Sequence, residues 1–599
     1  MIFRNQTEIT DFPFDSTCPP ETKKLSFGIK WPVVYLIEDD QSAYVGETTN
    51  ISIRLQCHLK SEGKSRLKHL HIIHNRAFNK SVILDIEKFL ITQISADGKY
   101  ILLNANGGQL PHDYYQCEHY RKEFKHIWEM LKEQGLVRHS FKEIQNSDRF
   151  KYSPYKTLTN QQYEIVDEII RNLKTDMTNG LQSRSIVING GSGTGKSVLG
   201  VFLLKLLADA KSDWTIQSKD GVFKLPEEDL NYITDQLPRK LRVGYVVPTL
   251  NFRTTLIKIF KELTPKKAKN CSNQDTPLIL SPNDVAKSDV IYDLLIVDEA
   301  HRLRRRKALS GGYTYKLFDN NNDNLGLDKE NGTELDWILK NSRYQIFFYD
   351  VGQSIKPTDV PKERFDTLSG NSDTHNYNLI SQLRCKGGND YIQYLENIFN
   401  CNKLEKLSFK DYSFRLYEDV HDMVKTIIRL DKRHGLCRNI AGYAWDWKTK
   451  EIKKARKERK GKTVKELLKE GLYDIEIDGH KYIWNLQTED WINSPDSVNQ
   501  IGCIHTIQGY DLNYAGVILG PEIDYDKKEN KVTIDRSKYK DAKGKEDISD
   551  SELLTYIKNI YKTNLARGVL GTYVYACNQG LRDYLRQYMD FIPHKLKRQ

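Results

Sequence analysis

The stretch INGGSGTGKS, at residues 188–197, decides the fold of this 599-residue chain. It stands between the apolar runs SIVIN and VLGVFLLKLLA, so the sequence predicts a buried strand, a Gly-rich loop and a helix in that order. The loop has the spacing G-x-x-x-x-G-K-S, in which backbone amides turn toward phosphate oxygens, the lysine reaches the outer phosphates and the serine hydroxyl binds magnesium. We therefore predict an ATP site. Its expected residues are Gly190, Gly193, Gly195, Lys196 and Ser197.

A second segment, LLIVDEAH at 294–301, supplies the acids that such a site needs. An apolar strand that ends in paired acids lets Asp298 hold magnesium, directly or through water, while Glu299 polarises the attacking water. Further apolar runs alternate with helical stretches from residue 158 onward, which favours parallel α/β sheets. These runs are RVGYVVPT, YQIFFYD, NIAGYAW and YAGVILG.

Length and composition set the class of protein. A chain of 599 residues is too long for one core, so about three domain-sized units are expected. With 39% hydrophobic and 29% charged residues, it is typical of soluble globular proteins. The net charge of +11 permits nucleic-acid binding without requiring it. The nine cysteines form no CxxC pair, no apolar run is long enough to cross a bilayer, and the N-terminus does not read as a signal peptide, so we expect a cytoplasmic protein.

From residue 158 to about 590 the chain resembles superfamily 1 helicases. The matching segments are LTNQQ (158–162), YVVPTLNFR (245–253), FFYDVGQS (347–354), SQLRC (381–385), HTIQGYD (505–511) and NLARGV (564–569). The resemblance implies that Gln162 reads adenine and that Gln353 senses the γ-phosphate. It also implies that Arg384 and Arg567 come from a second lobe and reach that phosphate only when the lobes close, which couples hydrolysis to motion.

The segments DEAHRLRRR and GYAWDWK narrow this resemblance. They are similar to a bacterial helicase-like subgroup related to the Schlafen ATPase-helicase domain. The basic run RLRRRK at 302–307 fits either the path of a nucleic-acid strand or an ordinary surface, and the sequence does not decide between them.

The first hundred residues carry a different pattern. WPVVYLIEDDQSAYVGE predicts a hairpin, Thr49 is expected to cap a helix that follows it, and NKSVILDIEKFLITQI predicts a second helix. VVY at 33–35 and YVG at 44–46 resemble the paired signatures of GIY-YIG nucleases. The run GETTNISIRLQCH matches that family's next motif. Its matching residues are Gly46, Thr48, Asn50, Arg54 and His58.

This second resemblance implies phosphodiester hydrolysis with one magnesium or manganese ion. Tyr35 or Tyr44 would act as general base, and the choice between them stays open. Arg54 would clamp the scissile phosphate, and His58 would orient it or assist proton transfer. The family's metal-binding acid corresponds to Glu87, and its asparagine near the site corresponds to Asn104. Val33 departs from the family pattern, which usually has glycine there.

We therefore predict an α/β protein with a small mixed nuclease domain and two RecA-like lobes. The expected bounds are 1–110 for the nuclease, 111–154 for a connector, 155–365 for the first lobe, and 366–599 for the second lobe with charged inserts near 449–470 and 524–551. The expected function is an ATP-dependent helicase or translocase that delivers its nuclease to nucleic acid, DNA in preference to RNA, in restriction, phage defence or repair. The alternatives are an ATP-switched clamp with an inactive nuclease, for which Val33 is the main support, and an RNA-directed enzyme.

Overall fold

A computed structural model describes most of the chain, in two units. The described residues are 7–104, 114–152, 158–181, 183–208, 215–218, 221–224, 229, 233, 241–263, 278–449, 462–486, 491–494, 496–507 and 509–594. The first unit comprises Met1–Gln182, Ser197–Tyr245 and Thr255–Ile279, and the second comprises Ser183–Lys196, Val246–Thr254 and Leu280–Gln599. Within the described residues, no helix has both the length and the apolar character needed to span a membrane.

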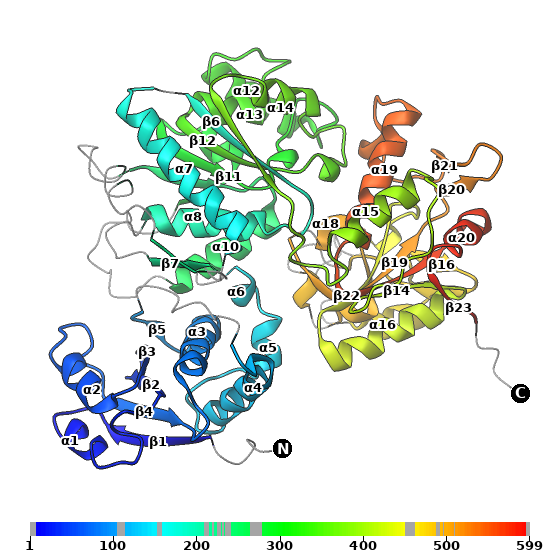
Figure 1. Ribbon diagram of the computed structural model, residues 1–599. Helices are drawn as coiled ribbons and strands as arrows, with labels where there is room; N and C mark the ends of the chain where they lie inside the picture. Colours follow the sequence, from blue (N-terminus) through cyan, green and yellow to red (C-terminus); the bar gives the residue numbers. More distant parts are fainter. Residues whose placement is uncertain are drawn as a thin grey trace, which may run out of the picture. The chain divides into compact units, whose positions relative to one another are not determined.

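The N-terminal part of the first unit is built on a mixed five-stranded sheet (Figure 1). Its order is β1-β4-β2-β3-β5, and only β3 and β5 are parallel among the paired strands. The strands are β1 (Glu8–Pro13), β2 (Val33–Glu38), β3 (Ser42–Thr48), β4 (His69–His74) and β5 (Ile101–Leu102). The helices are α1 (Cys18–Thr22), α2 (Ile51–Leu59), α3 (Lys80–Asp97), α4 (Cys117–Glu133), α5 (Phe141–Gln145) and α6 (Asp148–Lys151).

Alternation along β2 explains how this sheet buries both of its faces. Val34 and Leu36 belong to a core that includes residues of α3 and α4, whereas Tyr35 and Ile37 belong to a separate core with α1 and α2. The segment expected to be a connector contributes to the first of these cores, because Trp128 of α4 is fully buried in it. The N-terminal core therefore runs past residue 110, through helices α4 to α6.

The second sheet carries the phosphate loop. Its order is β10-β9-β11-β12-β6-β13, and the pairs of β12 with β11 and with β6, and of β6 with β13, are parallel. The strands are β6 (Arg184–Gly190), β9 (Val243–Val246), β10 (Leu278–Leu280), β11 (Tyr292–Val297), β12 (Ser342–Tyr349) and β13 (Thr374–Leu379). Because β13 lies beyond residue 365, the lobe boundary that we expected at 365 falls inside this sheet.

The helices associated with this stretch of chain follow the predicted alternation with the strands. They are α7 (Asn160–Thr178), α8 (Lys196–Ala208), α10 (Leu250–Leu263), α11 (Pro282–Ala286), α12 (Gly312–Asn324), α13 (Glu334–Lys340) and α14 (Lys362–Ser369), with a separate hairpin of β7 (Thr215–Ser218) and β8 (Gly221–Lys224). The short 3-10 helices η1 (Ala300–Arg302) and η2 (Val351–Gln353) follow β11 and β12.

The third sheet has the order β18-β15-β19-β22-β14-β23, and its paired strands are parallel. The strands are β14 (Ser413–Tyr417), β15 (Cys437–Ala441), β18 (Ile501–Gly502), β19 (Leu512–Leu519), β22 (Gly568–Ala576) and β23 (Asp590–Ile592). The helices are α15 (Gly388–Phe399), α16 (Val420–His434), α17 (Val464–Lys469), α18 (Ile504–Ile507), α19 (Asp550–Leu565) and α20 (Gln579–Leu585). This part of the chain also contains two separate hairpins. One pairs β16 (Ile475–Ile477) with β17 (His480–Tyr482), and the other pairs β20 (Ile523–Asp526) with β21 (Lys531–Ile534).

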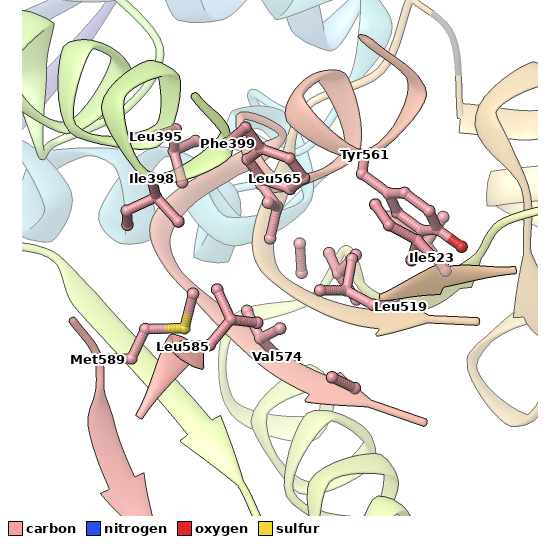
Figure 2. Packing of buried hydrophobic residues seen from close by; sticks show 14 of the residues in the cluster. Leu395, Ile398, Phe399, Leu519, Ile523, Tyr561, Leu565, Val574, Leu585 and Met589 are labelled. Carbon is pink, nitrogen blue, oxygen red and sulfur yellow. The ribbon is translucent and has the colours of Figure 1, made fainter. Parts of the chain in front are cut away.

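Alternate residues of β19 and β22 again divide between two cores. Figure 2 shows one of them, in which Val574 of β22 lies with Leu565 of α19 and Leu585 of α20. The expected surface insert near 524–551 contributes to this core, because Val532 and Tyr539 are buried there. Most of the other expected insert, residues 450–461, lies outside the described residues.

Candidate nucleotide and nuclease sites

The phosphate loop joins β6 to α8, as the sequence predicts. Two of its glycines are in the left-handed region, with φ of +88° at Gly193 and +82° at Gly195, which side chains other than glycine rarely adopt. A Cβ atom at Gly190 would come within 2.7 Å of Thr194 Oγ1. The backbone conformation therefore requires glycine at 193 and 195, and the close approach of Thr194 requires it at 190.

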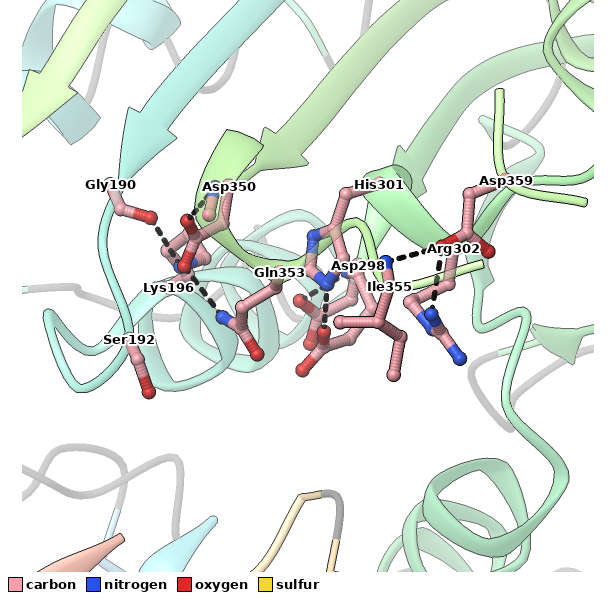
Figure 3. Close-up of polar contacts among 12 residues, drawn as sticks. Gly190, Ser192, Lys196, Asp298, His301, Arg302, Asp350, Gln353, Ile355 and Asp359 are labelled. Atoms are coloured by element: carbon pink, nitrogen blue, oxygen red, sulfur yellow. Dashed lines mark hydrogen bonds and ion pairs between the residues drawn. The ribbon is translucent and has the colours of Figure 1, made fainter. Parts of the chain in front are cut away.

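The Lys196 ammonium is held in place by the loop and by a buried acid (Figure 3). It donates a hydrogen bond to Gly191 O at 2.9 Å and a second to the carbonyl of Gly190, and it lies 3.3 Å from Asp350 Oδ2. The same Asp350 oxygen accepts a hydrogen bond from Gln353 Nε2 at 2.6 Å. Asp350, which follows β12, thus links the lysine of the loop to the glutamine that we expected to sense phosphate.

The paired acids follow β11. Asp298 is fully buried, and its backbone amide donates to Val246 O at 3.0 Å. Glu299 has φ of +51°, a strained value for a glutamate, and lies 2.8 Å from His301 Nε2.

Burial alone would raise the pKa of Glu299. The interactions with His301, followed by the positive charges of Lys196 and Arg567, together outweigh that effect and hold the pKa below its usual range. The carboxylate of Glu299 is therefore ionised at neutral pH, close to the positive charges of Lys196 and Arg567.

The two arginines meet this site from different segments. Arg384 Nη1 donates to Ser192 Oγ at 2.7 Å, and its Nε forms an ion pair with Asp511. Arg567 is 2% exposed and donates to Tyr510 O at 3.3 Å. Arg384 lies between β13 of the second sheet and α15, and the next residue, Cys385, is buried in a core of the third sheet. Its expected origin in the second lobe stays a prediction.

Gln162 belongs to the other unit, where it occupies the first turn of α7. The side-chain oxygen of Gln162 accepts a hydrogen bond from Thr159 N at 3.0 Å, and the backbone N of Gln162 donates one to Thr159 Oγ1 at 3.2 Å. This reciprocal pair is a capping box. Adenine reading by Gln162 stays a prediction, and so does the magnesium role of Ser197, the second residue of α8.

The basic run at 302–307 is largely neutralised by acids of the same unit. Arg302 pairs with Asp359 at 2.9 Å, and Arg304 pairs with Glu334 at 2.7 Å. Arg306 forms ion pairs as well, with Asp319 and Glu330. These contacts favour a structural role for the run over a path for nucleic acid.

Five of the expected nuclease residues come together between the N-terminal sheet and α2. Tyr35 is fully buried, and its hydroxyl lies 2.7 Å from His58 Nε2 and accepts from Arg54 Nε at 3.4 Å. The ring of Tyr44 lies edge-on to that of His58, with centroids 4.9 Å apart. Gly46 is opposite Tyr35 in the β2–β3 ladder, and a Cβ atom there would lie 2.3 Å from the Tyr35 hydroxyl.

The protonation of this group follows from burial and from two cations. Burial, followed by the charges of Lys64 and Arg54, lowers the pKa of His58 to about 3, so the imidazole is neutral. Burial raises the pKa of both Tyr35 and Tyr44. Lys64, which we did not predict as part of this site, places its Nζ 3.6 Å from the centroid of the Tyr44 ring.

Glu87 and Asn104 have different surroundings. Burial, followed by the charge of Glu47, raises the pKa of Glu87 to about 7. Asn104 holds the backbone of Val45, accepting from its N at 3.1 Å and donating to its O at 2.8 Å. Asn104 thus fixes β3 between Tyr44 and Gly46, and its part in the reaction stays a prediction.

Comparison with known proteins identifies the larger part of the chain. Residues 183–578 match the family model of the Schlafen group 3 DNA/RNA helicase domain. The chain belongs to this family. As a Schlafen group 3 helicase, it is a helicase-like ATPase of nucleic acid, which confirms the expectation from the ATP motifs; the nuclease resemblance of the first hundred residues stays a prediction.

Individual relatives are distant. The chain is 24% identical over 471 residues to an uncharacterized Saccharomyces cerevisiae protein, YPL245W, a match covering 72% of this chain and 90% of that protein. Among solved structures, Bacteroides Pif1 bound to single-stranded DNA matches with 11% identity and a TM-score of 0.27, over 72% of this chain and 97% of that one. A Saccharomyces cerevisiae Dbp5 variant bound to Nup159, Gle1, IP6 and ADP matches with 11% identity and a TM-score of 0.30, over 77% and 96%.

Proposed function

We propose that this Schlafen group 3 helicase is an ATP-driven translocase on nucleic acid that carries a metal-dependent endonuclease at its N-terminus. The observation that supports the nuclease is the buried contact of Tyr35 with His58, with Arg54 on the same hydroxyl. The motor is supported by the family and by the group of Lys196, Asp350 and Glu299.

In the motor, Lys196 binds the outer phosphates of ATP, and Glu299 orients the attacking water as a charged acceptor. Asp298 and Ser197 would hold magnesium, which supplies neutralising charge at the phosphates; carboxylate and hydroxyl oxygens are donors that this ion prefers. Arg384 and Arg567 stabilise charge that develops in the transition state. Because hydrolysis then depends on their placement, it is coupled to motion of the segments that carry them.

In the nuclease, Tyr35 takes a proton from water as the water oxygen bonds to phosphorus and the bond to the leaving sugar oxygen breaks. Tyr35 passes its own proton to His58, which lies within hydrogen-bond distance. The negative charge of the bound phosphate offsets Lys64 and Arg54, which together with burial lower the pKa of His58. Arg54 neutralises the phosphate. Glu87 would hold a magnesium or manganese ion, which supplies charge for the leaving oxygen, and a carboxylate fits either ion.

The substrate that we propose is DNA, in restriction, phage defence or repair. The inactive-clamp alternative depended on Val33 displacing its strand. Val33 is fully buried in β2 and opposite Thr48 in the ladder. The strand therefore begins in register at this position and is not displaced by the valine, which favours an active site over a degenerate one.

The test is nicking of a labelled plasmid with magnesium, with and without ATP. Glu87→Ala is expected to abolish nicking, and Lys196→Ala to remove its ATP dependence alone. Glu62→Ala, which changes an exposed glutamate of the same domain, serves as the matched control. An intact protein that hydrolyses ATP but cuts no DNA or RNA with either ion would overturn the nuclease half.

A further inference from the structure

The chain leaves β13 directly beside the phosphate loop. Leu379, the last residue of β13, is opposite Gly190 in the parallel ladder. The segment after it runs along the loop, because Leu383 N donates to Gly193 O at 2.9 Å. Residues almost two hundred positions apart in the sequence are thus tied together by backbone contacts.

The side chain of Gln382 strengthens this connection with both ends of its amide. Nε2 donates to Ser192 O in the loop at 2.7 Å. Oε1 accepts from the backbone N of Arg384 at 2.9 Å and from that of Cys385 at 3.3 Å. One planar group therefore fixes the loop on one side and the turn that carries Arg384 on the other.

Two neighbouring residues fit this arrangement. A Cβ atom at Gly193 would come within 2.0 Å of Gln382 Oε1, so the glycine leaves the space that the amide needs. Arg384 reaches the same loop residue as Gln382 does, because its Nη1 donates to Ser192 Oγ at 2.7 Å. The loop, the glutamine and the arginine form one connected group.

We propose that Gln382 is a positioning residue for ATP hydrolysis, which sets the place of Arg384 relative to the phosphate loop. The proposal rests on the proposed ATP hydrolysis and on Arg384 acting at the γ-phosphate. Arg384 has a long side chain that must contact the charge developing at the γ-phosphate. It loses less conformational entropy in making this contact when its backbone is already fixed. Asp511 holds the guanidinium of Arg384 at its other edge, through the ion pair at Nε.

The experiment compares steady-state ATP hydrolysis in the full-length protein and its variants. Gln382→Met keeps the volume but loses the amide, and Gln382→Glu keeps an acceptor but cannot donate to Ser192 O. Each is expected to lower kcat by about 10-fold or more, as loss of a positioned transition-state group does, and to change KM for ATP by less than about threefold.

A double-mutant comparison of Gln382 with Arg384 distinguishes a positioning role from a general structural effect. If Gln382 acts through Arg384, then Gln382→Met in the background of Arg384→Ala causes no further loss of kcat. Gln587→Ala, at an exposed glutamine of the same unit, is the matched control and is expected to behave as the intact protein. The proposal is overturned if the losses of kcat in Gln382→Met and Arg384→Ala multiply in the double variant. It is also overturned if kcat is unchanged in Gln382→Met.

A binding measurement keeps the inference testable without hydrolysis. A contact of Arg384 with the γ-phosphate favours a non-hydrolysable triphosphate over ADP, and Gln382→Met is expected to reduce that preference to the value in Arg384→Ala. A preference that survives in Gln382→Met contradicts the proposal. If the intact protein does not hydrolyse ATP, the proposed motor is contradicted. The ratio of the affinities for the non-hydrolysable triphosphate and for ADP would still decide the role of Gln382.

Discussion

The hydroxyl of Tyr35 lies 2.7 Å from Nε2 of His58, with both side chains buried in the N-terminal sheet. Burial and the charges of Lys64 and Arg54 lower the pKa of His58 to about 3, so it accepts the proton that Tyr35 must lose only when a bound phosphate offsets those charges. Tyr35→Phe is therefore expected to lower the rate of single-turnover nicking by about 100-fold or more. His58→Phe is expected to cause a similar loss, and the double variant to be no worse than either one, measured by nicking of a labelled plasmid.

The matched control for this relay is Tyr115→Phe, because Tyr115 is 85% exposed and loses the same hydroxyl. It is expected to nick at the normal rate. If the losses in Tyr35→Phe and His58→Phe multiply, the two residues act separately, and Tyr44 becomes the better candidate for the base.

Asn104 is expected to act on the site through the backbone of β3. Asn104→Leu leaves the buried N and O of Val45 without their partner, at a cost of about 1–3 kcal/mol for each unsatisfied group. We expect faster hydrogen exchange at Val45 and slower nicking. Asn79→Leu, which removes the N-cap of α3, is a control for stability alone. Slower nicking with unchanged exchange at β3 would instead make Asn104 a direct participant.

Glu299→Gln is expected to separate nucleotide binding from hydrolysis. The substitution keeps the shape of the side chain but removes the charge that orients water, so kcat for ATP should fall by about 100-fold or more with little change in the affinity for ADP. Steady-state hydrolysis and fluorescent ADP binding measure the two effects. Glu363→Gln, at an exposed glutamate, is the control. Equal losses of binding and hydrolysis would show that Glu299 holds the site together instead of acting on water.

The parts of this molecule that follow from local sequence could be predicted. The strand, loop and helix around Lys196 depend on apolar periodicity and glycines within a few residues of one another, and α3 follows the helical period of 79–94 and ends at Gly98 with φ of +67°. One local prediction, the N-cap of α2, was wrong. We expected Thr49, but the cap is Asn50, whose side chain accepts a hydrogen bond from Ile53 N at 3.2 Å.

What could not be predicted depends on which strands are neighbours. Gln382 meets the phosphate loop only because β13 pairs with β6, and no spacing in the sequence encodes that pairing. Lys64 likewise reaches Tyr44 from a turn after α2, and Trp128 joins the N-terminal core from a segment without clear periodicity. These contacts follow from tertiary structure, which overrides local pattern.

His71 gives the N-terminal sheet a predictable dependence on pH. It lies in β4, with Nδ1 2.7 Å from Asp11 Oδ1 and Nε2 3.5 Å from Glu38 Oε1. Burial alone would lower the pKa of His71, but the two carboxylates raise it above its usual value. The folded state therefore binds the proton more tightly than the unfolded chain does, whose histidine pKa is about 6.5. The resulting stability is fully present below that value and is lost as the pH rises through the folded pKa.

The measurement is the free energy of opening at the β4 amides, from hydrogen exchange corrected for intrinsic rates, between about pH 6 and pH 9. We expect this free energy to fall with rising pH in the intact protein and to be flat in His71→Gln. His69→Gln changes an exposed histidine of the same strand and is expected to keep the slope. A slope that persists in His71→Gln would assign the titration to another group, and a rise in stability with pH would mean that burial, and not Asp11 and Glu38, sets the charge of His71.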